Sequence, residues 1–136
     1  MIAAKGTTWP DRYTFSPALR VGNLLFISGT TATDDDGQTV APGNIVGQTR
    51  YIYGKFAALL AAAGGGLEHI VETTEYITTA ENYRRTADVR RELFRPPYPA
   101  ATGVIVAGLL REGALIEISA VAVLPTGTRL PAPESA

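Results

Sequence analysis

The sequence predicts an α+β domain in which two helices lie on one mixed β-sheet. Three observations support this fold class. The chain has 136 residues, a length typical of one domain. Several short runs are rich in apolar and β-branched residues, and two longer segments carry apolar residues at helical spacing. Their order is β-β-α-β-α-β-β, which we assign to a single domain over residues 1–124.

The N-terminal half begins with a predicted hairpin. We expect strands at residues 18–21 and 24–28, because a Gly-Asn dipeptide separates two apolar runs there. Residues 44–63 carry apolar side chains at helical spacing, and three consecutive glycines end the pattern at residues 64–66. This half therefore contributes two strands and the first helix.

The C-terminal half supplies the remaining elements. Residues 70–78 are rich in β-branched and aromatic types, which predicts a strand. Residues 80–94 have roughly helical spacing of apolar side chains, and two prolines end that pattern. Two strands at residues 102–107 and 114–124 complete the sheet. Residues 125–136 contain three prolines and no periodicity, so we expect a flexible tail.

Two helices on one side leave the other face of the sheet without a helical cover. Several of the predicted strands are apolar on more than one side. We therefore expect copies of the chain to associate through this face, most simply as a closed ring.

Composition narrows the function classes. Twelve basic and thirteen acidic residues leave a net charge of -1, so the chain has no overall positive charge to attract nucleic acid. There is no cysteine, which excludes thiolate chemistry and fits a reducing compartment. We find no membrane-spanning run and no leader pattern, and no spacing typical of a metal site. We therefore expect a cytoplasmic protein without metal, nucleic-acid or membrane partners.

Two separated motifs resemble those of a known family. Residues 15–29 read FSPALRVGNLLFISG, and residues 97–100 read PYPA, followed by IEISAVAV at residues 116–123. These segments resemble the opening and closing motifs of the Rid family, the reactive intermediate deaminases, also called YjgF. The resemblance spans roughly residues 13–124.

The resemblance carries expectations about fold and activity. It implies a fold like that of the bacillus type of chorismate mutase, assembled as a homotrimer with ligand clefts between subunits. It also implies a small-molecule substrate, a reactive enamine or imine, hydrolysed to ammonia and a ketone or keto acid. Neither a metal nor an organic cofactor is implied.

Three positions depart from the pattern of the family deaminases. The arginine that would bind a substrate carboxylate is replaced by Ala101. The tyrosine before the first strand is replaced by Phe15, and an asparagine of the second helix by Ala87. The resemblance therefore places Phe15 and Ala101 beside the substrate. Without the arginine, we expect a substrate other than the usual 2-imino acids.

Glu117 and Ser28 are the strongest catalytic candidates, and both match positions that line the family cleft. Glu117 interrupts an apolar strand, and a carboxylate removed from water accepts a proton more readily. We therefore expect Glu117 to activate water, with an ion pair across a subunit boundary as the alternative. Ser28, at a strand end, is a candidate ligand contact or a turn residue, and the adjacent Gly29 is a candidate substrate-binding residue.

Glu75 and Arg111 are weaker candidates. Alternation places Glu75 on the same side of its strand as Val71 and Ile77, where an unpaired charge is costly. Glu75 either faces the cleft and forms a carboxylate pair with Glu117, or it belongs to an interface ion pair or reaches solvent at a strand end. Arg111 lies in a predicted loop, either in a neighbouring cleft as a substitute anchor or in solvent.

Three functions remain open from the sequence. The first is a cofactor-free hydrolase or deaminase-like enzyme that acts on an enamine or imine without an α-carboxylate anchor. The second is a pathway-specific isomerase or cyclase acting on a bulkier substrate. The third is a trimer that binds a small metabolite without catalysis.

Overall fold

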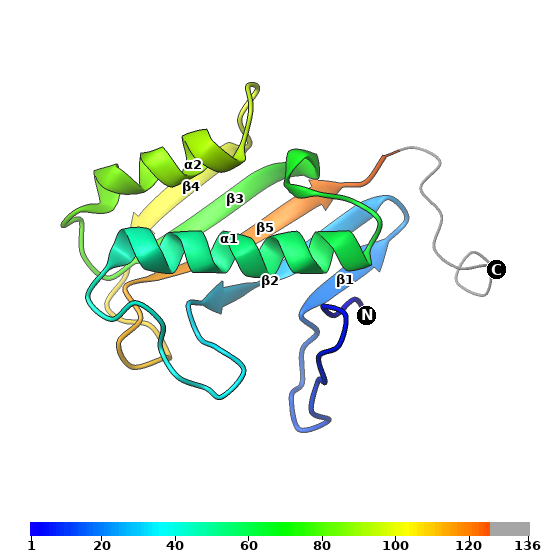
Figure 1. The fold of residues 1–136 in the computed structure, drawn as a ribbon, viewed down its shortest axis with the longest axis horizontal. Helices are drawn as coiled ribbons and strands as arrows, with labels where there is room; N and C mark the ends of the chain where they lie inside the picture. The colour runs from blue at the N-terminus through cyan, green and yellow to red at the C-terminus, as the bar shows by residue number, and fades with distance from the viewer. Residues whose placement is uncertain (126–136) are drawn as a thin grey trace.

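A computed structural model describes residues 1–125 (Figure 1), and it contains one five-stranded sheet with two α-helices on the same face. Strands β3 and β4 are parallel, and the other neighbouring strands are antiparallel. The predicted fold class is confirmed. Apart from its first residue, the predicted tail lies outside the described residues. The strands, in their order across the sheet, are β1 (Ala18–Val21), β2 (Leu24–Thr31), β5 (Ile116–Val123), β3 (Ile70–Ile77) and β4 (Ala100–Ile105).

Helix α1 (Ile45–Ala62) agrees closely with its predicted range. The side chain of Asn44 accepts a hydrogen bond from the Gly47 amide at 2.9 Å, which caps the first turn. Residues Ile52, Phe56 and Leu60 are fully buried. Helical spacing in this segment thus builds the contact between α1 and the sheet.

The second predicted helix is shorter than expected. A 3₁₀ turn (Tyr83–Thr86) precedes α2 (Ala87–Leu93), so no single helix covers residues 80–94. Asn82 has a positive φ of 59°, a left-handed conformation that a right-handed helix cannot include. A further 3₁₀ turn (Leu67–His69), which the sequence patterns did not predict, leads into β3.

Two bulges correct the predicted strands. Strand β2 continues to Thr31, because a register shift between Ile27 and Thr30 allows pairing to resume beyond the predicted end at residue 28. A second shift, near the start of β3, leaves Val71 exposed on the strand where alternation placed it with the core. From Thr73 onward the predicted alternation holds.

The two faces of the sheet differ in their cover. Both helices lie on one face (Figure 1), and the face away from them is here called the open face. Large apolar side chains of β1, β2 and β5 alternate with buried neighbours, so they project from the open face, 39% to 56% exposed. They are Leu19, Val21, Leu24, Phe26 and Val123. A contiguous apolar surface of this kind is typical of an interaction site.

Candidate functional site

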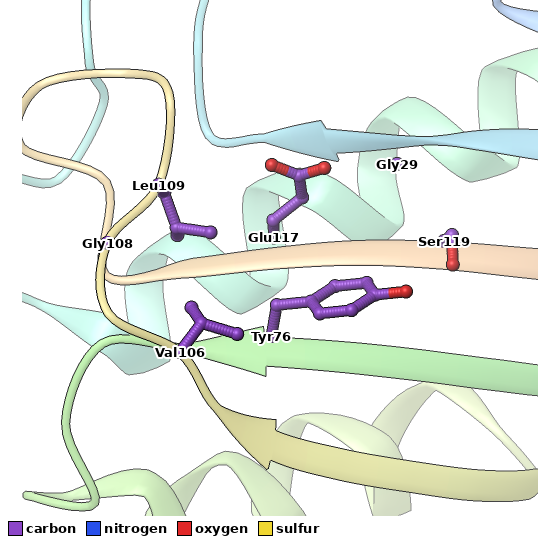
Figure 2. Close-up of a pocket in the computed structure, with 7 residues that line it drawn as sticks. All are labelled: Gly29, Tyr76, Val106, Gly108, Leu109, Glu117 and Ser119. Atoms are coloured by element: carbon purple, nitrogen blue, oxygen red, sulfur yellow. The ribbon is translucent and has the colours of Figure 1, made fainter.

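A pocket of about 300 Å³ lies on the open face, where β2, β3 and β5 meet the connection between β4 and β5. Figure 2 shows the seven residues that line it. We call this hollow the open-face pocket. Its lining residues are Gly29, Tyr76, Val106, Gly108, Leu109, Glu117 and Ser119.

Glu117 provides the carboxylate of the pocket. Its side chain is half-buried and points toward Gly29 on the neighbouring strand β2 (Figure 2). A Cβ atom at Gly29 would lie 2.5 Å from Glu117 Oε2, so a glycine at this position makes room for the carboxylate. Within residues 1–125, the Glu117 carboxylate has no hydrogen-bond or ion-pair partner. A carboxylate held in a pocket without a protein partner is available to water or to a ligand.

Two hydroxyl groups lie on another side of the pocket. The Tyr76 ring extends along the strands toward Ser119 (Figure 2), and both side chains are half-buried. In the described part of the chain, neither hydroxyl makes a hydrogen bond. Val106 and Leu109 supply the apolar part of the lining.

These lining residues were missed from sequence, although a signal for one of them was present. Alternation places Tyr76 on the side of β3 opposite Glu75. Ser119 follows Glu117 by two residues, which puts both on the same face of β5. Extending the alternation argument along β5 from Glu117 would have identified Ser119, whereas Tyr76 reaches the pocket only through the pairing of β3 with β5.

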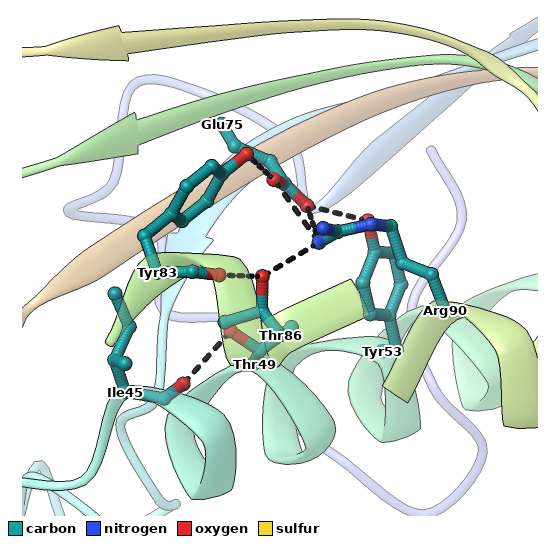
Figure 3. Close-up of polar contacts among 7 residues, drawn as sticks. All are labelled: Ile45, Thr49, Tyr53, Glu75, Tyr83, Thr86 and Arg90. Atoms are coloured by element: carbon teal, nitrogen blue, oxygen red, sulfur yellow. Dashed lines mark hydrogen bonds and ion pairs between the residues drawn. The ribbon is translucent and has the colours of Figure 1, made fainter. Parts of the chain in front are cut away.

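The structure does not bring Glu75 together with Glu117, which was one of the two possibilities for Glu75. Glu75 is 2% exposed and lies on the face that the helices cover. Figure 3 shows its carboxylate among Tyr53, Tyr83 and Arg90, all outside the open-face pocket. Successive strand residues face opposite sides of a sheet, so Glu75 is directed away from the pocket that Tyr76 lines.

The Glu75 carboxylate accepts bonds from three elements. Tyr53 on α1 donates from its hydroxyl at 2.9 Å, Tyr83 donates from the 3₁₀ turn at 2.5 Å, and Arg90 Nη1 on α2 lies 3.3 Å from both oxygens. The guanidinium also donates to Thr86 Oγ1 at 2.9 Å. Glu75 thus forms an ion pair within its own chain, not the interface pair or the solvent-reaching strand end that the sequence suggested. This cluster ties α1, the 3₁₀ turn and α2 to β3.

Burial shapes the protonation of this cluster. Desolvation, followed by the hydrogen bond and the charge of Glu75, raises the pKa of Tyr83 to about 12. Desolvation and the same carboxylate raise the pKa of Tyr53 as well. Both phenols therefore stay protonated at neutral pH and remain donors to Glu75.

Ser28 lies in a different hollow from Glu117. Its hydroxyl donates to the Ser16 carbonyl at 2.6 Å, which fastens the segment before β1 to β2. This hollow, of about 280 Å³, is lined by Ser16, Leu19, Phe26, Ile27 and Ser28. Within one chain, Ser28 thus has a backbone-bonding role, and Gly29 is the neighbour that reaches the open-face pocket.

Three other candidates lie outside the open-face pocket of the single chain. Phe15 is 53% exposed and packs with Trp9 and Tyr13 in an aromatic cluster. Ala101 lies on the edge strand β4 in register with the buried Thr73, and so on the side of the sheet away from the pocket. Arg111 is exposed in the connection between β4 and β5 but does not line the pocket. The expectation that Phe15 and Ala101 flank the same substrate as Glu117 is not met within one chain.

Lys55 fixes the strand end that borders the pocket. Its ammonium donates to Thr30 Oγ1 at 2.8 Å and to the carbonyl oxygens of Thr31 and Thr33 at 3.0 Å. Partial burial lowers the pKa of Lys55. All three ammonium donors have acceptors, so Lys55 anchors the end of β2 to α1.

Several basic side chains on the helix side are paired with carboxylates. Three of the arginines, Arg50, Arg90 and Arg91, form ion pairs with carboxylates on or beneath the α2 side. Over residues 1–125, no three histidine or acidic side chains gather as a metal site. No helix in the same range is long and apolar enough to cross a membrane.

The fold and this pocket define a class of α+β proteins in which helices cover one sheet face and a small pocket with a carboxylate opens on the other. Comparison with known proteins identifies the family. The family model described as Endoribonuclease L-PSP matches residues 9–124. The chain therefore belongs to this family, the Rid or YjgF family, and the resemblance found from sequence is confirmed.

Individual relatives agree with this assignment. A RutC family protein of Pyrococcus horikoshii is 33% identical over 108 residues, which cover 79% of this chain and 85% of that protein. The crystal structure of RidA from an Antarctic Psychrobacter is 27% identical, with a TM-score of 0.75 over 85% of this chain and 92% of that one. A Pseudomonas aeruginosa protein of unknown function, PA3499, is 31% identical, with a TM-score of 0.80 over 90% of each chain. Membership supports a small-molecule deaminase-like or hydrolase-like role at the level of the family.

Proposed function

We propose that this protein hydrolyses an imine or enamine that lacks an α-carboxylate anchor, with Glu117 as the group that activates water. One observation carries the proposal. The Glu117 carboxylate lies in the open-face pocket without a partner among residues 1–125, and Gly29 leaves space for it. A carboxylate that served only the fold would be expected to have donors around it, as Glu75 has.

The proposed reaction balances without a further reagent. Glu117 takes a proton from water as the water oxygen bonds to the imine carbon, and the imine nitrogen gains a proton. The resulting carbinolamine then loses ammonia, with cleavage of the carbon–nitrogen bond, and leaves a carbonyl product. An enamine enters the same route after a proton is added to its carbon.

We further propose that the protein works as a homotrimer whose subunits meet through the open face. Leu19, Val21, Leu24, Phe26 and Val123 expose apolar surface there, and burying it stabilises an assembly by roughly 25 cal/mol per Å². The family resemblance implies the same assembly. In a trimer, a neighbouring subunit can bring Phe15 to a pocket that it does not reach in its own chain.

The test is ammonia release from imines generated in place by an amino acid oxidase or an amine oxidase. We expect the wild type to accelerate release from at least one imine, and Glu117→Gln to lower the rate by about 10² or more. Glu81→Gln is the matched control, because Glu81 is exposed and lies outside the pocket. If Glu117→Gln retains the wild-type rate, Glu117 is not the base. If no imine responds to the wild type, the alternative of a trimer that only binds a metabolite is favoured.

A further inference from the structure

The charge of the open-face pocket restricts the ligands that it can hold. Glu117 is the one carboxylate among its seven lining residues, and no lysine, arginine or histidine lines it in the described part of the chain. A carboxylate on a substrate would therefore meet a like charge, without a cation to offset its loss of water. The pocket is electrostatically suited to a cation or to a neutral N–H group.

The hydroxyls of Tyr76 and Ser119 add a second recognition element. A hydroxyl both donates and accepts hydrogen bonds, so this pair suits a neutral oxygen-bearing substituent of either polarity. Neither group is engaged within residues 1–125, and Figure 2 shows the Tyr76 phenol directed toward Ser119 while the Glu117 carboxylate turns toward Gly29. The pocket thus offers an anionic end and a hydroxyl end, with Val106 and Leu109 as apolar lining.

We infer that the open-face pocket selects small imines that carry no carboxylate, with the cationic or N–H nitrogen at Glu117 and a hydroxyl or carbonyl substituent at Tyr76 and Ser119. The volume of about 300 Å³ is at the small end of ligand sites and fits a small metabolite. A protonated imine is a planar cation with N–H donors, and a carboxylate is its natural acceptor. The inference rests on the proposed hydrolase for its reaction, but the recognition can be measured without turnover.

Binding of benzamidine and benzoate tests the charge selection. Benzamidine presents a planar N–H cation on the same ring that carries a carboxylate in benzoate. We expect benzamidine to bind at least about tenfold more tightly than benzoate, measured by ligand-observed NMR or calorimetry. A hydrogen bond to a charged group contributes about 1.5 to 3 kcal/mol, so Glu117→Gln should lower the affinity for benzamidine by about 10-fold to 100-fold. Glu81→Gln should leave binding unchanged.

Two results would overturn the charge selection. One is benzoate binding as tightly as benzamidine. The other is equal benzamidine affinity in wild type and Glu117→Gln. Thermal unfolding of each variant, run beside the binding measurement, separates a lost contact from a lost fold.

Hydroxylated probes test the second element. We expect 3-hydroxybenzamidine or 4-hydroxybenzamidine to bind more tightly than benzamidine. Tyr76→Phe and Ser119→Ala should each reduce the preference for the hydroxylated probe by about 2-fold to 10-fold, because one neutral hydrogen bond changes affinity by about that factor. Affinity for benzamidine itself should stay constant, because Tyr76→Phe keeps the ring. These hydroxyls do not determine specificity if neither hydroxylated isomer binds more tightly than benzamidine. The same holds if the substitutions weaken the binding of hydroxylated probes and of benzamidine equally.

A pair of substrates separates this inference from the proposed function. An amine oxidase converts benzylamine to an imine without a carboxylate, and an amino acid oxidase converts phenylglycine to the corresponding 2-imino acid. Faster hydrolysis of the benzylamine imine supports both proposals. Faster hydrolysis of the 2-imino acid keeps the hydrolase and overturns the selection. Turnover of neither imine, with benzamidine binding that depends on Glu117, keeps the selection and counts against the hydrolase.

Discussion

Glu75 and Glu117 lie on opposite faces of one sheet, and the same substitution at each should have opposite consequences. Glu75→Gln replaces a buried carboxylate that accepts from Tyr53, Tyr83 and Arg90, so an amide N–H group would face donors. Breaking a buried ion pair costs about 3 to 5 kcal/mol. The side chain of Arg90 is 24% exposed and can turn partly to water, so we expect about 3 kcal/mol.

Glu117→Gln should change stability by less than about 1 kcal/mol, because no partner within residues 1–125 is lost. It should abolish most of the imine hydrolysis, whereas Glu75→Gln should keep the activity of the fraction that is folded. For a domain of this size, about 3 kcal/mol corresponds to a Tm lower by roughly 10 to 15 °C.

The assay is thermal and urea unfolding at one fixed protomer concentration, since association would otherwise shift the transition. Tyr83→Phe provides a smaller step, about 1 kcal/mol for one half-buried donor. The reasoning is refuted if Glu75→Gln is as stable as the wild type, or if Glu117→Gln unfolds as easily as Glu75→Gln.

Three further predictions follow from the same contacts. Gly29→Ala should push the Glu117 carboxylate aside and lower the rate of hydrolysis at least about tenfold. The Tm should change by a few degrees at most, since the clash is with the end of a flexible side chain. A wild-type rate would contradict this role of Gly29. The free energy of unfolding should fall as pH rises from 10 to 12, because the unfolded chain loses the Tyr83 proton at its ordinary pKa of 10.0 while the folded chain holds it to about 12. Urea unfolding at several pH values should show a smaller fall for Tyr83→Phe. An equal fall in the variant and the wild type would count against this role of Tyr83. Phe26→Asp should convert a trimer to monomers in sedimentation experiments, because a charge would be buried in the proposed interface. An intact trimer would show that the subunits do not meet at Phe26.

Local patterns were sufficient for most of the fold. The spacing of Ile52, Phe56 and Leu60 predicted α1, and β-branched and aromatic residues predicted β3. Long-range geometry decided the remainder. The left-handed Asn82 divides the second helical segment, and bulges in β2 and β3 change which residues share a face.

For the candidate site, the sequence identified Glu117 and Gly29, and the structure places them together. It did not predict the contribution of Tyr76, which depends on the pairing of β3 with β5, and it missed Ser119, although Ser119 shares a face of β5 with Glu117. Ser28 was grouped with Glu117 from its motif, yet its hydroxyl bonds to Ser16 within the same chain.

By itself, the sequence determined the α+β class, the family and the presence of an acidic residue in an apolar strand, since these depend on periodicity and on local motifs. Only the tertiary structure decided which acidic side chain is buried among donors and which lines the open-face pocket. That decision depends on what the opposite faces of the sheet meet: the helices bring Tyr53, Tyr83 and Arg90 to Glu75, and nothing in residues 1–125 brings a donor to Glu117. Contacts between segments distant in the chain set the environment of a charge, and local spacing carries no record of them.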